Sequence, residues 1–172
     1  MPKWNQKYWQ DLNEEFDKLT ENLDSRLDDV VEGRVAPALE DIKIGSGRKL
    51  DGTILFFDIR NFTSRVNSSE LDKLKETLLM LNCVIPMVMR VIYDNNGYIE
   101  KNTGDGVMAI VGIEDDKTTS VNNAINAATI IFYILKNLIN PFLTDLGIKK
   151  VDARIGIDTG TLLITRIGLP KG

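Results

Sequence analysis

Two aspartates occupy positions where a carboxylate needs a partner. Asp58 closes the continuous apolar run Thr53–Phe57, and Asp105 lies between two glycines in the turn sequence Thr103–Gly106. A carboxylate at the end of a buried strand must be solvated, hydrogen-bonded or bound to a cation. Two neighbouring carboxylates repel each other unless a cation or a proton lies between them. Because oxygen ligands suit Mg²⁺ and Mn²⁺, a fold that brings Asp58 and Asp105 together would create a divalent metal site.

The segment Ile59–Thr63 follows the first of these aspartates directly. Its backbone N–H groups could hold a polyphosphate whose charge is shared with bound metal ions. A plain strand-to-helix loop is the alternative, and the residues alone leave both interpretations open.

Composition excludes several other kinds of chemistry. The 172 residues include no histidine, which excludes Ser-His-Asp and Cys-His catalysis and zinc sites with a histidine ligand within the chain. Lys and Arg total 21 against 25 Asp and Glu, and this formal charge of −4 argues against binding nucleic acid by bulk electrostatics. The single cysteine, Cys83, cannot form an internal disulfide, which fits a reducing compartment.

The sequence also predicts a globular protein that needs no membrane. Apolar residues make up 43% and charged residues 27% of the chain, which is typical of a packed core. We see no apolar run close to the ~20 residues of a membrane span, and residues 1–12 lack the apolar stretch of a signal peptide. We therefore expect a soluble cytoplasmic protein.

Apolar periodicity predicts the elements that position the two aspartates. Residues 1–31 are predicted to form one amphipathic helix, residues 32–50 a connector, and residues 51–172 the main domain. The apolar residues of the helix recur at steps of three and four and share one face: Trp4, Tyr8, Leu12, Phe16, Leu19, Leu23, Leu27 and Val30. We expect this face to pack on the chain's own domain or on a twin subunit.

Strands and helices alternate within the main domain. Helices are predicted over Ser69–Asn95 and Thr119–Asn140, and strands over Thr53–Phe57, Tyr98–Asn102, Val107–Gly112, Val151–Asp158 and Thr161–Ile167. Pro86 is expected to kink or break the first helix, and Gly45-Ser-Gly47 is expected to be a turn in the connector. This order predicts an α+β fold, a ferredoxin-like βαββαβ sandwich with one extra strand. In that fold the end of the first strand lies beside the central hairpin, so Asp58 and Asp105 should converge.

Three segments resemble motifs of the class III nucleotide cyclase catalytic domain, in the order and approximate spacing of that family. They are Phe57-Asp-Ile-Arg-Asn-Phe-Thr63, Glu100-Lys-Asn-Thr-Gly-Asp-Gly-Val-Met-Ala109 and Arg154-Ile-Gly-Ile-Asp-Thr-Gly160. The family versions read F-x-D-I-x-x-F-T, E-K-x-x-G-D and R-I-G-I-H-T-G. Upstream, Gly33-Arg-Val-Ala-Pro37, Glu40-Asp-Ile42 and Leu50-Asp51 also resemble the bacterial pyrimidine cyclases of Pycsar antiphage systems.

The resemblance implies roles for the residues that match the motif positions. Asp58 and Asp105 match the catalytic, metal-binding aspartates, and the Ile59 carbonyl matches a further ligand, for two Mg²⁺ or Mn²⁺ ions per site. Lys101 matches the base-contacting lysine of members that use adenine. The triphosphate-binding loop is matched by Ile59, Arg60, Asn61, Phe62 and Thr63.

The implied reaction converts a ribonucleoside triphosphate to its 3′,5′-cyclic monophosphate and pyrophosphate. One metal would lower the pKa of the attacking 3′-hydroxyl, and the other would neutralise the leaving phosphates. The upstream resemblance favours CTP or UTP as substrate, whereas Lys101 alone favours an adenylate cyclase that makes cAMP. A non-catalytic, cyclase-like regulatory domain is a further alternative, disfavoured because both aspartates are present. A diguanylate-cyclase-like enzyme is disfavoured because Thr103–Gly106 replaces the expected G-G-[DE]-E-F hairpin.

Two features depart from the family pattern. Asp158 occupies the position of the common histidine in the third motif. The family's second base-contacting residue, and the Asn and Arg that stabilise the transition state, belong to a C-terminal third with no match up to Gly172. We therefore expect residues 1–172 by themselves to be inactive.

The resemblance also implies partners. Family members work as head-to-tail homodimers in which both subunits build each site. A role like that of the Pycsar cyclases would add a separate effector protein that senses the cyclic nucleotide.

Overall fold

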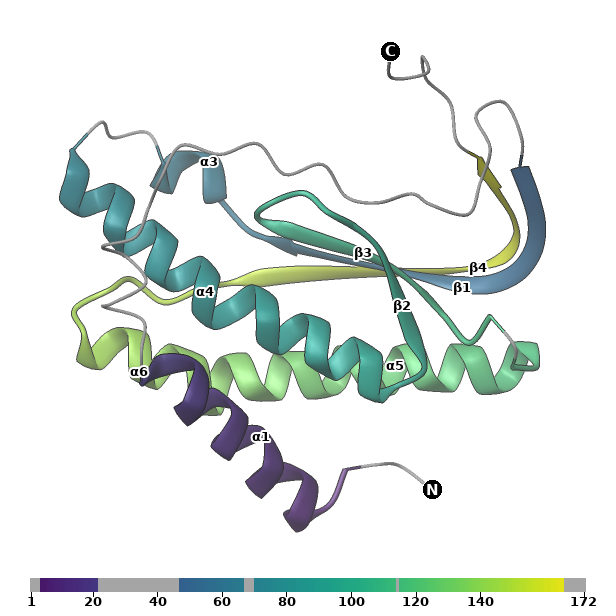
Figure 1. Cartoon of the computed structure of the whole chain (residues 1–172), viewed down its shortest axis with the longest axis horizontal. Helices are drawn as coiled ribbons and strands as arrows, with labels where there is room; N and C mark the ends of the chain where they lie inside the picture. Colours follow the sequence, from purple (N-terminus) through teal and green to yellow (C-terminus); the bar gives the residue numbers. More distant parts are fainter. Residues whose placement is uncertain (1–3, 22–46, 67–69, 114, 166–172) are drawn as a thin grey trace.

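The computed structural model describes residues 4–21, 47–66, 70–113 and 115–165. Within these residues one antiparallel sheet has the strand order β2-β3-β1-β4. Its strands are β1 (Gly47–Ile59), β2 (Gly97–Asn102), β3 (Gly106–Val111) and β4 (Ala153–Thr165). Helices α4 (Leu71–Asp94) and α5 (Lys117–Ile134) cover one face of the sheet (Figure 1). The predicted α+β class and βαββαβ order are confirmed.

The side chains of the central strand β1 point alternately to the core under the helices and to the opposite face of the sheet. Leu55, Phe57 and Ile59 are each at most 2% exposed and belong to the core under the helices. Phe56 points to the opposite face, because successive side chains of a strand alternate, and it is 49% exposed. Asp58 also points to this face, which we call the open face of the sheet. The open face is therefore the one on which the predicted site must lie.

The strands β1 and β4 are longer than the sequence predicts. β1 begins at Gly47, inside the predicted connector, and pairs with β4 along its whole length. The two strands predicted on either side of Thr159-Gly160 are one continuous strand, so the predicted extra strand is wrong. Gly160 lies opposite Gly52 in this pairing, and two facing glycines leave room for the curl that β1 and β4 make together in Figure 1.

Helix α4 continues through Pro86, so the predicted break does not occur. Proline removes one helical hydrogen bond, but burial of both neighbouring turns stabilises the helix; Val84 and Val88 have no exposed surface. Cys83 lies in the same buried stretch, and burial raises the pKa of its thiol to about 12. The second predicted helix also runs further than expected, through a π-helical turn (Leu135–Ile139) into α6 (Asn140–Asp145). Pro141 fits there because the first turn of a helix needs no N–H donor.

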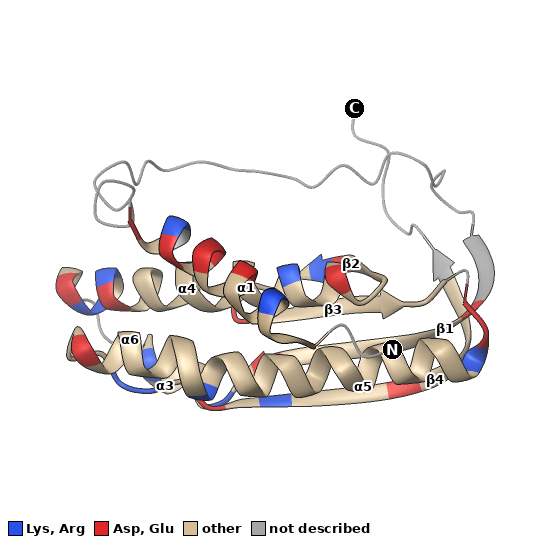
Figure 2. Cartoon of the chain, turned by 90° about the horizontal axis from the view of Figure 1, so that it is seen from below, with Lys and Arg blue, Asp and Glu red and all other residues tan. Residues whose placement is uncertain are grey.

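Helix α5 is nearly uncharged along its length (Figure 2). By length and composition alone, α4 and the stretch Lys117–Asp145 are apolar enough to cross a membrane. In the structure both helices pack against the sheet, as core helices of a globular domain also do.

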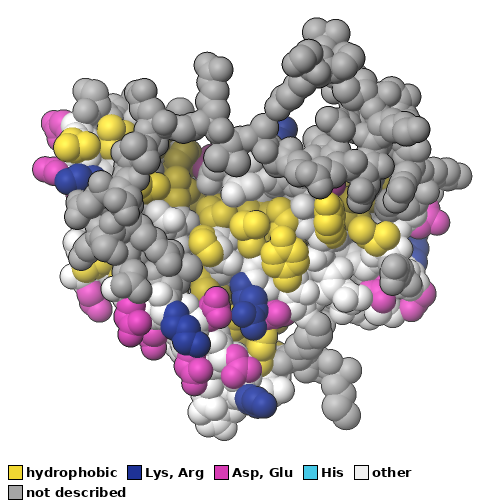
Figure 3. Space-filling model, viewed as in Figure 1, with side chains coloured by type: hydrophobic (Ala, Val, Ile, Leu, Met, Phe, Trp, Pro, Cys, Tyr) yellow, Lys and Arg dark blue, Asp and Glu magenta, His cyan; other side chains and the backbone are white. Residues whose placement is uncertain are grey.

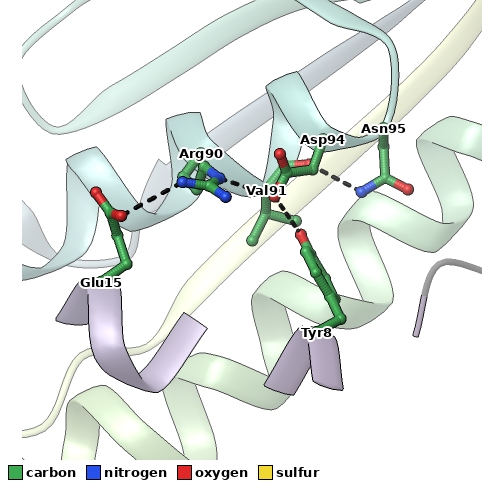
Figure 4. Close-up of polar contacts among 6 residues, drawn as sticks. All are labelled: Tyr8, Glu15, Arg90, Val91, Asp94 and Asn95. Atoms are coloured by element: carbon green, nitrogen blue, oxygen red, sulfur yellow. Dashed lines mark hydrogen bonds and ion pairs between the residues drawn. The ribbon is translucent and has the colours of Figure 1, made fainter. Parts of the chain in front are cut away.

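The N-terminal helix α1 (Gln6–Thr20) packs on the helix layer of its own chain. Leu12 and Phe16 are buried in the common core. The Tyr8 hydroxyl donates to Asp94 Oδ2 at 2.7 Å (Figure 4). Arg90 lies between Asp94 and Glu15: its Nε is 2.9 Å from Asp94 Oδ2, and its Nη1 is 3.4 Å from Glu15 Oε2. The remainder of the predicted helix, residues 22–31, and the connector up to residue 46 lie outside the described residues.

Candidate active site

Asp58 lies near the end of β1, at a position paired with both neighbouring strands. It pairs in register with Gly106 of β3 on one side and with Arg154 of β4 on the other. Its side chain is 34% exposed, and its Oδ2 accepts a hydrogen bond from Arg154 Nε at 2.6 Å. The carboxylate therefore stands at the edge of the open face with one cationic neighbour.

Asp105 is held beside Asp58 by the backbone. The Ile59 N–H donates to the Asp105 carbonyl at 3.1 Å, which fixes the hairpin turn to the last residue of β1. Within the turn the Thr103 N–H donates to the Gly106 carbonyl at 2.9 Å, and Gly104 has a φ of 96°, in the region that favours glycine. The structure thus brings the segments that carry Asp58 and Asp105 to one edge of the sheet.

Gly106 leaves the space that this approach requires. A Cβ at Gly106 would lie 2.9 Å from the Phe57 carbonyl oxygen and 3.7 Å from Asp58 Oδ1. Contacts below about 3 Å between carbon and oxygen are repulsive, so a side chain here would force the hairpin away from β1. The glycine after Asp105 is therefore part of the geometry of the site.

The loop after β1 makes a left-handed turn into a short helix. Asn61 has a φ of 58° and precedes α3 (Phe62–Arg65). The N–H groups of Ile59 and Arg60 already donate to carbonyls, those of Asp105 and Asp152. The N–H groups in the first turn of α3 have no acceptor within the helix, so a bound polyphosphate would be held by the second half of the predicted loop, Asn61, Phe62 and Thr63.

Arg65 fixes α3 to the segment before β4. Its guanidinium donates to the Lys149 carbonyl at 3.0 Å and to the Lys150 carbonyl. Burial lowers the pKa of this guanidinium from its usual value, which still leaves it charged at neutral pH. Arg60 and Asp152 form a second, exposed contact at 3.7 Å on the same edge. These contacts hold the loop against β4.

Lys101 lies on the same face as Asp58 but two strands away. A bulge between Ile99 and Lys101 shifts the register, so that Lys101 pairs with Met108, which in turn pairs with Phe56. Neighbouring strands are ~4.8 Å apart, so the two intervening spacings put Lys101 about 10 Å from β1. Its exposed side chain is thus well separated from the Asp58 edge of its own chain.

The comparisons with known proteins show the family of this chain. Residues 46–171 match the family described as the adenylate and guanylate cyclase catalytic domain. The chain belongs to this family.

Three relatives show how far the similarity extends. The chain is 30% identical over 135 residues to an adenylate cyclase of Dictyostelium discoideum, covering 78% of this chain and 6% of that protein. It is 31% identical over 107 residues to a cytidylate cyclase of Staphylococcus aureus, covering 62% of this chain and 25% of that protein. The crystal structure of the guanylyl cyclase Cya2 has a TM-score of 0.61 and 27% identity, covering 76% of this chain and 63% of that one. The chain thus spans less than two thirds of each of these proteins.

The donor set of the cyclase domain fits hard divalent ions. No group of three or more Asp, Glu, Cys or His side chains close enough to hold a metal occurs among the described residues. The two aspartates and the Ile59 carbonyl would therefore supply part of the oxygen ligands, and substrate phosphates and water would supply the others, which is how Mg²⁺ is usually bound at phosphate-transfer sites. The room that Gly106 leaves beside Asp58 is consistent with this fit.

Arg154 is the residue at this edge to which the sequence analysis gave no role. It stands first in the third motif, but its motif position does not reveal its partner. Its contact with Asp58 depends on the register between strands that lie 96 residues apart in the chain.

A cavity of about 450 Å³ lies at the other end of β1. Its lining includes Asp51, Asp116, Ser120 and Thr159. The side-chain oxygens of Asp51 and Asp116 already accept hydrogen bonds from protein groups. None of the predicted site residues lines this cavity, so it is separate from the Asp58 edge.

Proposed function

We propose that this chain forms part of a nucleotide cyclase that converts a ribonucleoside triphosphate to its 3′,5′-cyclic monophosphate. In this reaction the substrate 3′-oxygen bonds to the α-phosphorus, the bond from that phosphorus to the β-phosphate oxygen breaks, and the hydroxyl proton leaves. Pyrophosphate is the second product. The observation that carries the proposal is the approach of the Asp58 and Asp105 segments at one edge of the open face.

Each residue of this edge has a role that its position supports. Asp58, Asp105 and the Ile59 carbonyl would hold two divalent ions, and bound Mg²⁺ or Mn²⁺ supplies Lewis acidity to the reacting oxygens. The first-turn N–H groups of α3, with Asn61, would bind the triphosphate through backbone hydrogen bonds. Arg60, exposed on the same loop, would add positive charge. These groups orient the chain of phosphates so that the α-phosphorus faces the 3′-hydroxyl.

For the base we propose a pyrimidine, CTP or UTP. The cytidylate cyclase of S. aureus supports this choice, as does the upstream resemblance in residues 33–51. An adenylate cyclase is the second candidate, because Lys101 matches the adenine-contacting lysine and the D. discoideum relative is an adenylate cyclase.

We propose a homodimer in which the open faces of two chains enclose the substrate. Phe56 and Tyr98 are 49% and 58% exposed on this face. Figure 3, which views the domain from the side, shows a band of hydrophobic side chains across the middle of the molecule. A second copy would bury these side chains. The second copy would also bring its Lys101 to the Asp58 edge of the first chain, which the first chain's own Lys101 does not reach.

The biological setting is proposed from the relatives alone. A cytoplasmic signal in antiphage defence, read by a separate effector protein that senses the cyclic nucleotide, would fit the Pycsar resemblance.

The experiment is product identification by mass spectrometry. The full-length protein is incubated with each of ATP, GTP, CTP and UTP and Mn²⁺. We expect a cyclic pyrimidine nucleotide from the wild type, and at least a hundredfold lower rate for Asp58→Asn and Asp105→Asn, as for loss of a group that acts in the transition state. Asp51→Asn, at the other end of β1, is the matched control and should retain the rate. Cyclic AMP as the main product would establish the second candidate, and no cyclic product from any nucleotide would reject the cyclase function.

A further inference from the structure

The ion pair between Asp58 and Arg154 uses an oxygen that a metal would need. Arg154 Nε lies 2.6 Å from Asp58 Oδ2, so the two side chains form a charge-assisted hydrogen bond. The two residues face each other across the β1–β4 pair, so the contact is built into the register of the sheet. A carboxylate that already has this partner cannot offer the same oxygen to a cation at full strength.

A metal ion and the guanidinium are both cations, and at one carboxylate they repel each other. Like charges close to one carboxylate repel each other, and the repulsion is stronger here because the metal carries two charges. Arginine also has no lone pair to donate to a metal. Binding of the metal to Asp58 and the contact with Arg154 therefore oppose each other.

We propose that Arg154 is a displaceable counter-ion, which holds Asp58 until a divalent metal replaces it and so sets the metal affinity of the site. This inference rests on the proposed function, because it concerns the metal site of that function. Arg154 is a positioning residue in this role: it acts on the metal through Asp58.

The environment of Arg154 allows its side chain to leave. Its side chain is 74% exposed, and the described contact joins one nitrogen, Nε, to one oxygen. Exposed ion pairs of this kind contribute little to stability. Arg65, by comparison, is partly buried and bonds to two carbonyls. Arg154 can therefore rotate away from Asp58 without disturbing the backbone pairing of β4.

The first test measures Mn²⁺ affinity by isothermal titration calorimetry, without nucleotide, on residues 1–172. We expect Arg154→Ala to bind Mn²⁺ about two- to fivefold more tightly than wild type, as loss of a weak competing ion pair predicts. Lys150→Ala is the matched control, because it removes one exposed positive charge near the same edge and leaves Asp58 untouched. Lys150→Ala should change the Mn²⁺ affinity by less than half as much as Arg154→Ala does. Arg154→Lys, which keeps the charge, should stay within about twofold of wild type.

The second test observes the displacement directly. The Nε–H resonance of Arg154, assigned by its absence in Arg154→Ala, is followed by NMR during a Mg²⁺ titration. We expect the resonance to move toward the position of a free arginine with the same midpoint as the change in the Asp58 carboxyl carbon. The Nε–H resonance of Arg65 should not follow that midpoint.

The outcomes separate this proposal from the function on which it rests. If Asp58→Asn loses Mn²⁺ binding but Arg154→Ala binds no more tightly than Lys150→Ala, the counter-ion proposal is overturned and the metal site stands. An Arg154 resonance that stays in place while the Asp58 carboxyl responds to Mg²⁺ would overturn it equally. Absence of Mn²⁺ binding in every variant, or binding that Asp58→Asn does not change, would overturn the counter-ion proposal, whereas the metal site of the proposed function is tested separately with nucleotide present.

Discussion

At the scale of single residues, the geometry of the Asp58 edge depends on one position without a side chain. The hairpin approaches β1 so closely that a methyl group at Gly106 would meet the Phe57 carbonyl oxygen at 2.9 Å. That oxygen belongs to the backbone and cannot move without disturbing the β1–β3 pairing. The position of Asp105 beside Asp58 therefore requires glycine here.

Gly106→Ala is expected to lower the free energy of unfolding by about 1–3 kcal/mol, the usual cost of forcing an atom into a packed site. Urea denaturation followed by circular dichroism measures it. Gly156→Ala is the control on β4, on the other side of β1, because a Cβ there meets nothing within 4 Å. It should change the free energy by less than about 0.5 kcal/mol. Equal effects of the two substitutions would contradict the close approach of the hairpin.

The sequence allowed the prediction of Asp58 and Asp105 but not of the charge opposite Asp58. A carboxylate after an apolar run and another in a glycine turn are visible in local sequence. The contact of Arg154 with Asp58 is visible only in the β1–β4 register. The engagement of the Ile59 and Arg60 N–H groups likewise depends on carbonyls from distant segments, so the predicted phosphate loop was longer than the part with available donors.

At the scale of elements, α1 is attached to α4 by a hydrogen bond in a partly buried position. Tyr8 donates to Asp94, which also accepts from Arg90 (Figure 4). The pKa of the Tyr8 hydroxyl lies well above its usual value. Burial is the largest cause, and the hydrogen bond to Asp94 and the negative charge of Asp94 add to it. The tyrosine is therefore a neutral donor throughout the physiological range.

Tyr8→Phe should lower the free energy of unfolding by about 1 kcal/mol, the typical net contribution of one hydrogen bond, or somewhat more because the acceptor is charged. Because the folded state favours the neutral phenol, this contribution is present below pH ~10, where unfolded tyrosine ionises, and is lost as the pH rises further. Chemical denaturation at pH 7 and at pH 11 tests both parts. Tyr93→Phe, 53% exposed on α4, is the control, and a loss for Tyr8→Phe no larger than for this control would argue against the contact.

Element types could be predicted from the sequence, whereas element ends could not. The 3.6-residue period identified α4 and α5, but Pro86 suggested an interruption that packing overrides. Thr159-Gly160 suggested a turn, yet full pairing with β1 makes it the middle of a strand. In each case contacts with a distant part of the chain decided the outcome over local preference.

At the scale of the whole molecule, the N-terminal helix and the open face of the sheet differ in how much apolar surface they expose. Leu12 and Phe16 of the N-terminal apolar stripe are buried in the chain's own core, and Trp4 and Tyr8 pack against it partly buried. Leu12 and Phe16 are therefore not available to a second subunit, and we look for the dimer interface on another surface. The open face, with Phe56 and Tyr98 exposed, is that surface in our proposal.

Phe56→Glu is accordingly expected to convert the full-length protein from a dimer to a monomer, because it would place a charge in an apolar interface. Multi-angle light scattering measures the mass of each variant. Leu71→Glu, at a position that is 65% exposed on the first turn of α4, should leave the dimer intact. A Phe56→Glu variant that still has twice the chain mass would place the interface elsewhere.

The central claim is that Asp58 and Asp105 hold metal ions for a bound nucleoside triphosphate. Anomalous diffraction at the manganese edge, from crystals grown with Mn²⁺ and a non-hydrolysable CTP analogue, tests it most directly. We predict manganese peaks that contact both carboxylates and the Ile59 carbonyl, with the triphosphate against the first turn of α3. Manganese or nucleotide bound only in the cavity lined by Asp51 and Asp116, with none at the Asp58 edge, would contradict the claim.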